Sequence, residues 1–314
     1  MANANHSQMN NEVTLLIDGN NTLHRTHWIA NNTGRPLVNS KGVNTGSIFA
    51  FIKTIKANAT QFNADKIYIA WDKRFDYETP NFRKTLTEGT YKSTRNQERN
   101  KSVYDSMDPI VNIVTSLGIR NIYPGKLEAD DVISWLSKSI PGKKVIVSVD
   151  NDFAQLVSPD VSFFNPIKKV IINVDNFSEH FGLTPKEYVY YKAIAGDKSD
   201  NIPGLEGFGK IKGQKLAKAY AAGNPEALQY KEHIDSVLKL VDLNYGLEQF
   251  PDEVALYEKQ AAELKSVQPD FNNFTAICEE LEFKSVVENL VDWKKVFNKQ
   301  ANNKALVDFC KLFS

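Results

Sequence analysis

Short apolar segments alternate with helical patterns along roughly the first 175 residues of this chain, and this alternation constrains the fold more than any other feature. A run of about five apolar residues bounded by turn residues is typical of a buried strand. Strands that alternate with helices usually pair in parallel. The sequence therefore predicts an α/β fold with a mostly parallel central sheet covered by helices. The expected strands are Val13–Ile17, Lys66–Trp71, Ile119–Tyr123, Lys144–Val149, Val161–Phe164 and Lys169–Val174, and the expected helices include Ile48–Ile55, Val103–Leu117 and Pro185–Ala195.

Beyond residue 175 the strand patterns fade and helical patterns continue to the end of the chain, with a glycine-rich segment at Ile202–Gly213. We therefore expect a flexible polar tail at residues 1–12, an α/β core at 13–183 and a helical part at 184–314. The segment Lys73–Lys101 differs from both parts, because it is basic, weakly periodic and too long for an ordinary connection. Segments of this kind are usually functional or disordered.

Carboxylates gather at the carboxyl ends of the expected strands. Asp18, Asp72 and Asp150 each follow a strand, and a short turn separates another strand from the acidic sequence LEADD. In open α/β sheets the ligand crevice lies outside this edge. A single aspartate at a strand end is more often a turn or cap residue, so only the group is informative. The nine candidates are Asp18, Asp72, Glu128, Asp130, Asp131, Asp150, Asp152, Asp197 and Asp200.

All nine candidate ligands are oxygen donors, and no comparable set of His or Cys accompanies them in the sequence. Oxygen ligands suit the hard cations Mg²⁺ and Mn²⁺. Two such ions about 4 Å apart can bracket a phosphodiester, activate water and stabilise the leaving oxygen. The acids therefore predict a two-metal site for phosphodiester hydrolysis.

Composition excludes several classes of protein. The chain carries 38 Lys and Arg against 38 Asp and Glu, which excludes a globally basic nucleic-acid binder but not one with separate basic patches. No apolar run approaches the roughly 18 residues of a membrane span, so we expect no membrane partner. The polar first twelve residues do not form a secretory signal. Because Cys278 and Cys310 are the only cysteines, we expect a reducing, cytoplasmic location.

Several motifs occur together in one order. They are LLIDGNNTLHR at 15–25, WDKR at 71–74, FRKTL at 82–86, YKSTR at 91–95, LEADD at 127–131, SVDNDFAQL at 148–156 and GDKSDNIPGLEGFGKIKG at 196–213. Through these motifs residues 13–290 resemble the 5′-nuclease family of flap endonucleases and 5′–3′ exonucleases, which includes the N-terminal domain of bacterial DNA polymerase I and stand-alone phage enzymes. The resemblance implies a PIN-like fold with a helical arch at 73–102 and a helix–three-turn–helix near 202–217.

The resemblance also implies a role for each matched residue. Five acids, from Asp18 to Asp131, would mainly hold the catalytic ion, and the other four would hold the second ion. In the arch, Lys92 would contact the scissile phosphate and Arg95 would add a second cation. Contacts to DNA are implied for Arg25, Arg83, Tyr91, Gly207, Gly209, Lys210, Lys212 and Lys215.

The expected cofactors are two Mg²⁺ ions, with Mn²⁺ as a substitute, and K⁺ at the helix–three-turn–helix. The expected partners are DNA with a 5′ flap, nick or 5′ end, RNA–DNA hybrids and replication proteins, and the protein is expected to be a monomer. Because the chain ends at Ser314 with no polymerase following, we expect a stand-alone enzyme, either phage-encoded or bacterial, with a phage origin favoured. The expected location is the cytoplasm, which is that of a bacterial host if the enzyme is phage-encoded.

The sequence thus predicts a Mg²⁺-dependent 5′–3′ exonuclease and flap endonuclease that acts in DNA replication or repair by a two-metal-ion mechanism. Two alternatives remain. One is a non-catalytic DNA-junction-binding protein that has the hairpin and the arch but no working metal site, and an intact set of acids argues against it. The other is a ribonuclease that mainly removes RNA primers.

Overall fold

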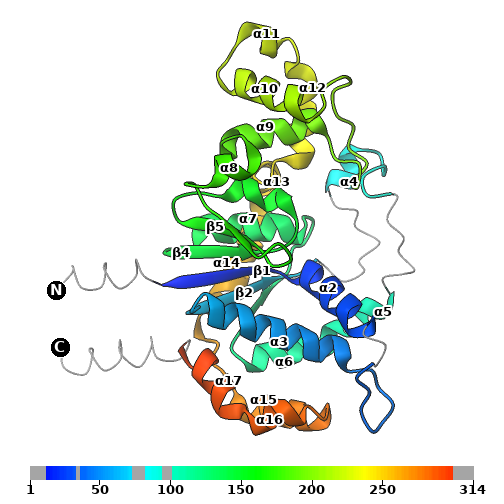
Figure 1. The fold of residues 1–314 in the computed structure, drawn as a ribbon, viewed down its shortest axis with the longest axis vertical. Helices are drawn as coiled ribbons and strands as arrows, with labels where there is room; N and C mark the ends of the chain where they lie inside the picture. The colour runs from blue at the N-terminus through cyan, green and yellow to red at the C-terminus, as the bar shows by residue number, and fades with distance from the viewer. Residues whose placement is uncertain (1–11, 33–35, 73–81, 94–100, 300–314) are drawn as a thin grey trace, which may run out of the picture. The chain divides into compact units, whose positions relative to one another are not determined.

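The computed structural model of the protein describes residues 12–32, 36–72, 82–93 and 101–299. The chain forms two compact units that are interleaved in sequence (Figure 1). The first unit comprises Met1–Ala70, Gln97–Ile122 and Lys259–Ser314, and the second comprises Trp71–Asn96 and Tyr123–Glu258. These units do not follow the predicted boundary at residue 183. The division into a nuclease core and a DNA-binding part therefore stays a functional prediction.

Three parallel strands form the sheet of the first unit. They are β1 (Val13–Asp18), β2 (Lys66–Ala70) and β3 (Arg120–Ile122), in the order β3-β2-β1. Leu16 lies opposite Tyr68, and Ile69 lies opposite Asn121. The side chains of Leu15, Leu16 and Ile17 are all fully buried, which is typical of a parallel strand that is covered on both faces.

Helices pack around these strands within the first unit. Helix α2 (Gly19–Asn31) contacts β1, β2 and the neighbouring helix α3 (Gly46–Gln61). The predicted helix Val103–Leu117 is divided into α5 (Lys101–Tyr104) and α6 (Met107–Ser116). Pro109 explains the break, because a proline fits the first turn of a helix but cannot continue one. The unit ends with η3 (Leu264–Ser266), α15 (Phe271–Glu280), α16 (Lys284–Glu288) and α17 (Leu290–Phe297).

The second unit contains the other three strands. Strand β4 (Lys143–Val147) pairs in parallel with β5 (Val161–Asn165), and β5 pairs antiparallel with β6 (Val170–Ile172). A short 3-10 helix, η2 (Asn151–Leu156), follows β4. The helices of this unit are α4 (Phe82–Leu86), α7 (Ala129–Ser139), α8 (Phe177–Phe181), α9 (Pro185–Ala195), α10 (Lys210–Ala221), α11 (Pro225–Leu228), α12 (Lys231–Val241), α13 (Tyr245–Gln249) and α14 (Pro251–Glu263).

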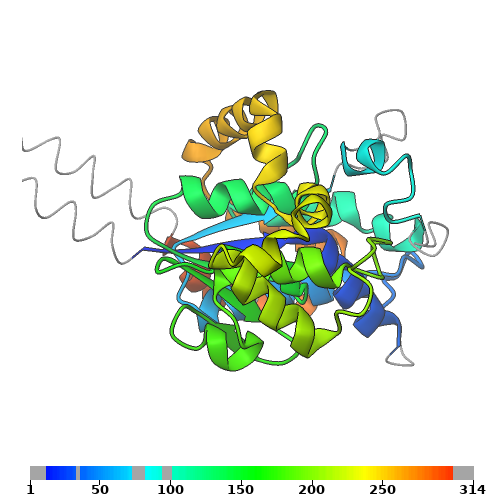
Figure 2. The ribbon, with the colours of Figure 1, turned by 90° about the horizontal axis from the view of Figure 1, so that it is seen from above.

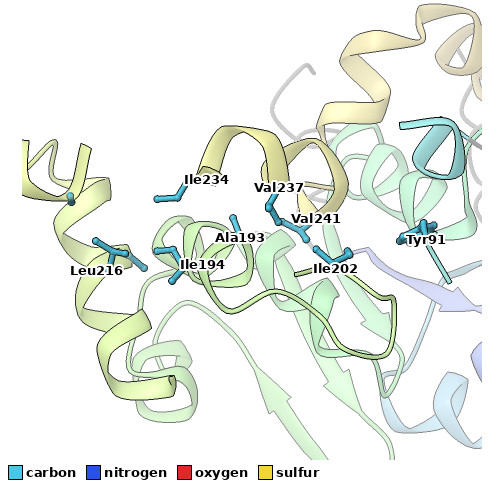
Figure 3. Close-up of a cluster of buried hydrophobic side chains, with 10 residues drawn as sticks. Tyr91, Ala193, Ile194, Ile202, Leu216, Ile234, Val237 and Val241 are labelled. Atoms are coloured by element: carbon cyan, nitrogen blue, oxygen red, sulfur yellow. The ribbon is translucent and has the colours of Figure 1, made fainter. Parts of the chain in front are cut away.

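A buried apolar cluster joins several of these helices. Helix α9 packs against both α10 and α12, as Figures 1 and 2 show. Ile194 of α9, Leu216 of α10 and Val237 of α12 belong to the cluster, and so does the ring of Tyr91 (Figure 3). Burial of this cluster therefore fixes the segment that carries Tyr91 against the helices that flank the glycine-rich segment.

The predicted fold class is confirmed. All six predicted strands are present with ends within two residues of those expected, and the pairs are parallel except for β5 with β6. Residues 184–299 contain helices and turns only, as predicted. No helix in the described part of the chain is both long enough and apolar enough to cross a membrane.

Candidate active site

The first group of predicted acids meets at the N-terminus of α7, where Glu128 is the N-cap and Asp130 and Asp131 lie in the first turn. Asp72, two residues after the end of β2, lies close to them. Its Oδ1 accepts a hydrogen bond from the N–H of Ala129 at 2.8 Å. The first N–H groups of a helix have no partner within the helix and favour anions. The fold therefore gathers these four carboxylates at one helix end.

Arg83 of α4 balances two of these acids. Its Nη1 and Nη2 donate to Oδ2 and Oδ1 of Asp131 at 2.7 and 2.8 Å, and Nη1 also lies 3.2 Å from Oε2 of Glu128. Arg83 is only 1% exposed, and its Nε donates to the carbonyl oxygen of Leu240 at 2.9 Å. In this structure the guanidinium is therefore occupied by these partners, and the predicted contact of Arg83 with DNA stays a prediction.

Tyr91 and Lys92 complete the surroundings of Glu128. The hydroxyl of Tyr91 donates to Oε2 of Glu128 at 3.0 Å, and Nζ of Lys92 donates to Oε1 at 2.7 Å. Burial alone would raise the pKa of Glu128, but the charges of Lys92 and Arg83 outweigh it and lower this pKa to about 2. The Tyr91 ring is buried in the apolar cluster of Figure 3, so in this structure it is not exposed for stacking on a base.

Lys92 also reaches the second group of acids. Its backbone N–H donates to the carbonyl oxygen of Asp200 at 3.0 Å, and its Nζ lies 4.0 Å from Oδ2 of Asp200. The side-chain amide of Asn201 donates to the carbonyl oxygen of Thr90 at 3.1 Å, next to the same contact. Desolvation would lower the pKa of Lys92, but Glu128, together with weaker contributions that include Asp130 and Asp200, raises it well above its ordinary value. Lys92 is therefore a charged link between the two groups.

A second lysine, Lys192 of α9, bridges the other acids. Its Nζ lies 2.7 Å from Oδ1 of Asp152 and 2.9 Å from Oδ2 of Asp197. Asp150 is the N-cap of η2 and accepts a hydrogen bond from the N–H of Asp152 at 2.8 Å, which keeps these two carboxylates close together. The loop after α9 folds tightly enough for Asp197 and Ile202 to exchange two backbone hydrogen bonds, and this loop presents both Asp197 and Asp200.

The pKa shifts of this group reflect one lysine shared among several acids. Burial and the negative charge of Asp150 raise the pKa of Asp152 to about 6, although Lys192 acts in the opposite direction. Burial also opposes ionisation of Asp197, but hydrogen bonds from Ser199 and Lys192 lower its pKa to about 2. These carboxylates hold more negative charge than Lys192 alone balances, which is the electrostatic setting that favours a bound cation.

Asp18 and Arg25 belong to the first unit. Asp18 ends β1 and caps α2, because its Oδ1 accepts a hydrogen bond from the N–H of Asn21 at 3.0 Å. Arg25 lies two turns further along α2, and burial lowers its pKa while the charge of Asp18 opposes the shift. Among the described residues, the buried Nε and Nη2 of Arg25 have no hydrogen-bond partner. An unpaired buried guanidinium suits an anion such as a phosphate oxygen.

The glycine-rich segment forms the turns between α9 and α10. Gly207 has a φ of 79°, which favours glycine, and Gly209 is the N-cap of α10. A Cβ atom at either glycine would face open space, so a ligand can approach the backbone there. No side chain caps the N-terminus of α10 among the described residues, and an uncapped helix N-terminus is a common site for anions. The three predicted lysines on this helix, Lys210, Lys212 and Lys215, are all exposed.

Two points complete the comparison with the predicted site. Arg95 lies outside the described residues. Within the described part of the chain, no group of three or more His, Cys, Asp or Glu side chains is arranged to hold a metal ion. Lysine side chains contact acids of both groups. The sequence analysis did not single out Lys192. The sequence feature that could have indicated its role is that Lys192 is the only charged residue in the apolar and aromatic run YVYYKAIA, just before Asp197.

Comparison with known proteins identifies relatives across most of the chain. Residues 13–182, more than half of the chain, match the family model of the 5′–3′ exonuclease N-terminal resolvase-like domain. A 5′–3′ exonuclease of Buchnera aphidicola subsp. Schizaphis graminum is 33% identical over 200 residues, which are 62% of this chain and 66% of the relative. A 5′–3′ exonuclease of Aquifex aeolicus is 28% identical over 307 residues, which are 93% of this chain and 98% of the relative.

The fold is also similar to that of solved structures. A bacteriophage T5 flap endonuclease in a complex with DNA and metal ions has a TM-score of 0.64 at 19% identity, covering 82% of this chain and 99% of that one. At this identity the likeness concerns the fold. Together with the family match, it confirms the predicted resemblance to the 5′ nucleases.

Proposed function

Because the chain belongs to the 5′–3′ exonuclease family, we propose that it is a metal-dependent, structure-specific nuclease that hydrolyses DNA phosphodiesters at 5′ flaps, nicks and 5′ ends. One observation carries this proposal beyond the family. Acids from separate segments of the second unit converge at the α7 N-terminus and around Lys192, and Lys92 links the two groups. A structural ion pair needs one acid for each cation, whereas here each lysine is shared by two acids.

The donor set fits divalent metal ions. The ammonium groups of Lys92 and Lys192 provide the positive charge that a metal ion would provide. Each lies between two carboxylates that would otherwise repel one another. We propose that Asp72, Glu128 and Asp130 hold one ion and that Asp150, Asp152, Asp197 and Asp200 hold another, while Asp18 stays a predicted ligand of the first. Divalent ions bound to these oxygens supply Lewis-acid activation of water and of the phosphodiester.

The remaining residues would bind and orient the substrate. Exposed Lys210 and Lys212, with the open glycine backbone at the start of α10, suit the phosphates of a duplex. The unpaired atoms of Arg25 suit one further phosphate. The ammonium of Lys92 would contact the scissile phosphate, where a positioned cation stabilises charge that develops in the transition state. Arg95 is proposed to act with it.

The finer assignments of cofactor and partner are part of this proposal. We expect Mg²⁺ as the working ion, with Mn²⁺ able to replace it, because both prefer oxygen ligands. We also expect K⁺ at the turns before α10, RNA–DNA hybrids as additional substrates, replication proteins as partners, a monomeric state and a cytoplasmic location. The exposed lysines and open backbone of α10 support the DNA contact, and the remaining expectations rest on the sequence.

Cleavage of a 5′-labelled flap substrate, measured with Mg²⁺ and with EDTA, tests the proposal. We expect cuts near the flap junction in Mg²⁺ only. Asp130→Ala should abolish cleavage but leave binding of the flap in Ca²⁺ within a few-fold of wild type, because it removes a metal ligand and leaves α10 intact. A 3′ flap of the same sequence is the control substrate and should stay uncut.

Three outcomes would overturn the proposal. Tight binding without cleavage by the wild-type protein would indicate a junction-binding protein. Much faster cleavage of an RNA flap than of the matched DNA flap would indicate a ribonuclease that removes primers. Near-wild-type turnover of Asp130→Ala in Mg²⁺ would show that the acids at α7 do not form the metal site.

A further inference from the structure

Arg83 links three elements of the second unit. It lies on α4, within the segment 73–102 that the sequence predicts to be an arch, and its guanidinium reaches Asp131 on α7 through two parallel hydrogen bonds. Its Nε donates to the carbonyl oxygen of Leu240 on α12. Two parallel bonds to a carboxylate are the strongest and most orienting contact that an arginine makes. Arg83 therefore fixes α4 to both α7 and α12.

The carboxylate of Asp131 already accepts three hydrogen bonds, which occupy three of its four lone pairs. Each of its oxygens accepts a bond from Arg83, and Oδ2 also accepts the N–H of Glu128 at 3.0 Å. The residue is 0% exposed. A Cβ atom added at Gly246 would lie 3.1 Å from Oδ1 of Asp131 and 3.1 Å from the ring of Phe82, so the carboxylate is enclosed tightly on that side.

The pair acts on Glu128 from two sides. Asp131 holds the backbone N–H of Glu128, and Arg83 reaches Oε2 of its carboxylate at 3.2 Å. Glu128 is the acid that Lys92 and Tyr91 contact, so its orientation affects the whole first group of acids. For Asp131 to bind a metal ion instead, it would have to leave Arg83 as a buried charge without its partner, which is strongly unfavourable.

We propose that Arg83 and Asp131 are a positioning pair. Asp131 does not bind the metal ion and Arg83 does not contact DNA. Together they hold Glu128 in the orientation that a metal ion requires. The proposal rests on the proposed function, since it assigns two of the predicted site residues to the support of the metal ligands. Groups that orient metal ligands typically change metal affinity or activity by about 10–100-fold when they are removed.

The test uses a double variant that replaces the pair with apolar side chains, Arg83→Met with Asp131→Leu. An apolar replacement of a buried ion pair usually folds, whereas loss of one partner leaves a buried charge. The matched control is Asp130→Asn, which alters the neighbouring acid on the same turn of α7. Each protein is measured for its melting temperature, for the number and affinity of bound Mn²⁺ ions by calorimetry, and for flap cleavage in a single turnover.

We expect the double variant to bind as many Mn²⁺ ions as the wild-type protein, with an affinity and a single-turnover rate that are about 10–100-fold lower. Asp130→Asn should instead lose a Mn²⁺ site. A double variant that loses one site would show that Asp131 is a ligand, and one with unchanged affinity and rate would show that the pair is merely structural. Either result overturns the inference.

Arg83→Lys provides a second test, which also applies if the double variant does not fold. It keeps the charge but cannot make both parallel bonds, so we expect Mn²⁺ affinity to fall by at least about threefold while flap binding in EDTA and its salt dependence stay unchanged. Unchanged Mn²⁺ affinity, or weaker flap binding in EDTA with a shallower salt dependence, overturns the inference. A wild-type protein that binds no Mn²⁺ overturns the proposed function and the inference with it, whereas changes confined to the variants concern the inference alone.

Discussion

Both the side chain and the backbone of Lys92 make contacts in this structure. Its side chain is 16% exposed, its Nζ donates to Glu128, and its backbone N–H holds the loop of Asp200. Its φ of 54° places it in the left-handed region, which a residue other than glycine occupies only when its surroundings hold it there. A lysine constrained in this way is held beside the acids by the fold, unlike a surface lysine that only adds charge.

Lys92→Ala should therefore reduce catalysis far more than binding. If its ammonium meets the scissile phosphate as charge develops, the single-turnover rate should fall by about 10²–10³-fold, by analogy with the removal of one oxyanion donor. Flap affinity in Ca²⁺ should stay within a few-fold of wild type. Lys198→Ala, which removes an exposed lysine from the loop between Asp197 and Asp200, is the control and should change affinity only slightly. Equal single-turnover rates for the two variants would show that Lys92 contributes no more to catalysis than an exposed surface lysine.

Cys278 of α15 is a second residue whose chemistry depends on the fold. Burial, with a smaller effect of Glu279, raises the pKa of its thiol from 9.0 to about 12. A raised pKa disfavours the reactive thiolate in the folded state, so this contribution to stability is complete below about pH 9 and is lost as the pH rises towards 12. We expect iodoacetamide at pH 8 to leave Cys278 unmodified in the folded protein and to modify it in urea, as peptide mass spectrometry can determine. Rapid labelling without urea would contradict the burial of the Cys278 side chain.

At the scale of elements, the proposed contact with DNA lies on α10 and not on α9. Helix α9 is held between α10 and α12 and directs Lys192 towards the acids, whereas α10 exposes its lysines and its uncapped N-terminus. Gly213, a weak helix former, is explained by packing. A Cβ atom there would lie 3.2 Å from the ring of Tyr191 on α9, so glycine allows the two helices to approach closely.

Removal of Lys210 and Lys212 should weaken binding to flap DNA of any sequence. Each lysine that neutralises a phosphate contributes about 0.9 to the slope of log affinity against log salt, so the double alanine variant should reduce this slope by about 2. Lys218→Ala is the matched control, because Lys218 is an exposed lysine in the last turn of the same helix. Binding measured between 50 and 200 mM salt, roughly the range in which such contacts are lost, provides the slope. A slope that Lys218→Ala reduces equally would indicate diffuse charge attraction.

At the scale of the whole molecule, basic side chains neutralise part of the negative charge of the site in this structure. Arg83, Lys92 and Lys192 each contact two of the predicted acids, and each unit has a core of buried apolar side chains. The metal-free protein should therefore be folded, unlike small proteins whose folding depends on a bound metal ion.

Thermal melting with EDTA and with Mn²⁺ tests this balance. The wild-type protein should melt cooperatively in EDTA, and Mn²⁺ at about 100 times its dissociation constant should add about 2.7 kcal/mol of stability for each bound ion. In Lys192→Met, Asp152 and Asp197 lose their shared cation, so the protein should melt lower in EDTA and gain more from Mn²⁺ than the wild-type protein does. The exposed Lys198→Met is the control. An unfolded wild-type protein in EDTA, or equal gains for the two variants, would contradict the prediction.

Much of the fold and of the site could be predicted because it is encoded locally. Apolar runs such as Val13–Asp18 form strands because their side chains are buried on both faces, and the aspartate that ends each run marks the strand end wherever the strand lies. The LEADD motif begins a helix because carboxylates stabilise its first N–H groups. The exposed lysines and glycines at the start of α10 likewise depend on neighbours a few residues away.

The tertiary structure alone decided which charges are paired. Arg83 and Lys92 both lie in a basic segment, and its sequence does not show which of its charges are buried. In the structure Arg83 is buried against Asp131, 48 residues away, and Lys92 reaches Glu128, 36 residues away. Lys192 carries no motif, and its importance comes from its position between Asp152 and Asp197. Spacing along the chain determines which residues share a helix face or a strand end. The partner of a long charged side chain depends instead on which elements pack together, because only burial makes an ion pair strong enough to fix one partner among many.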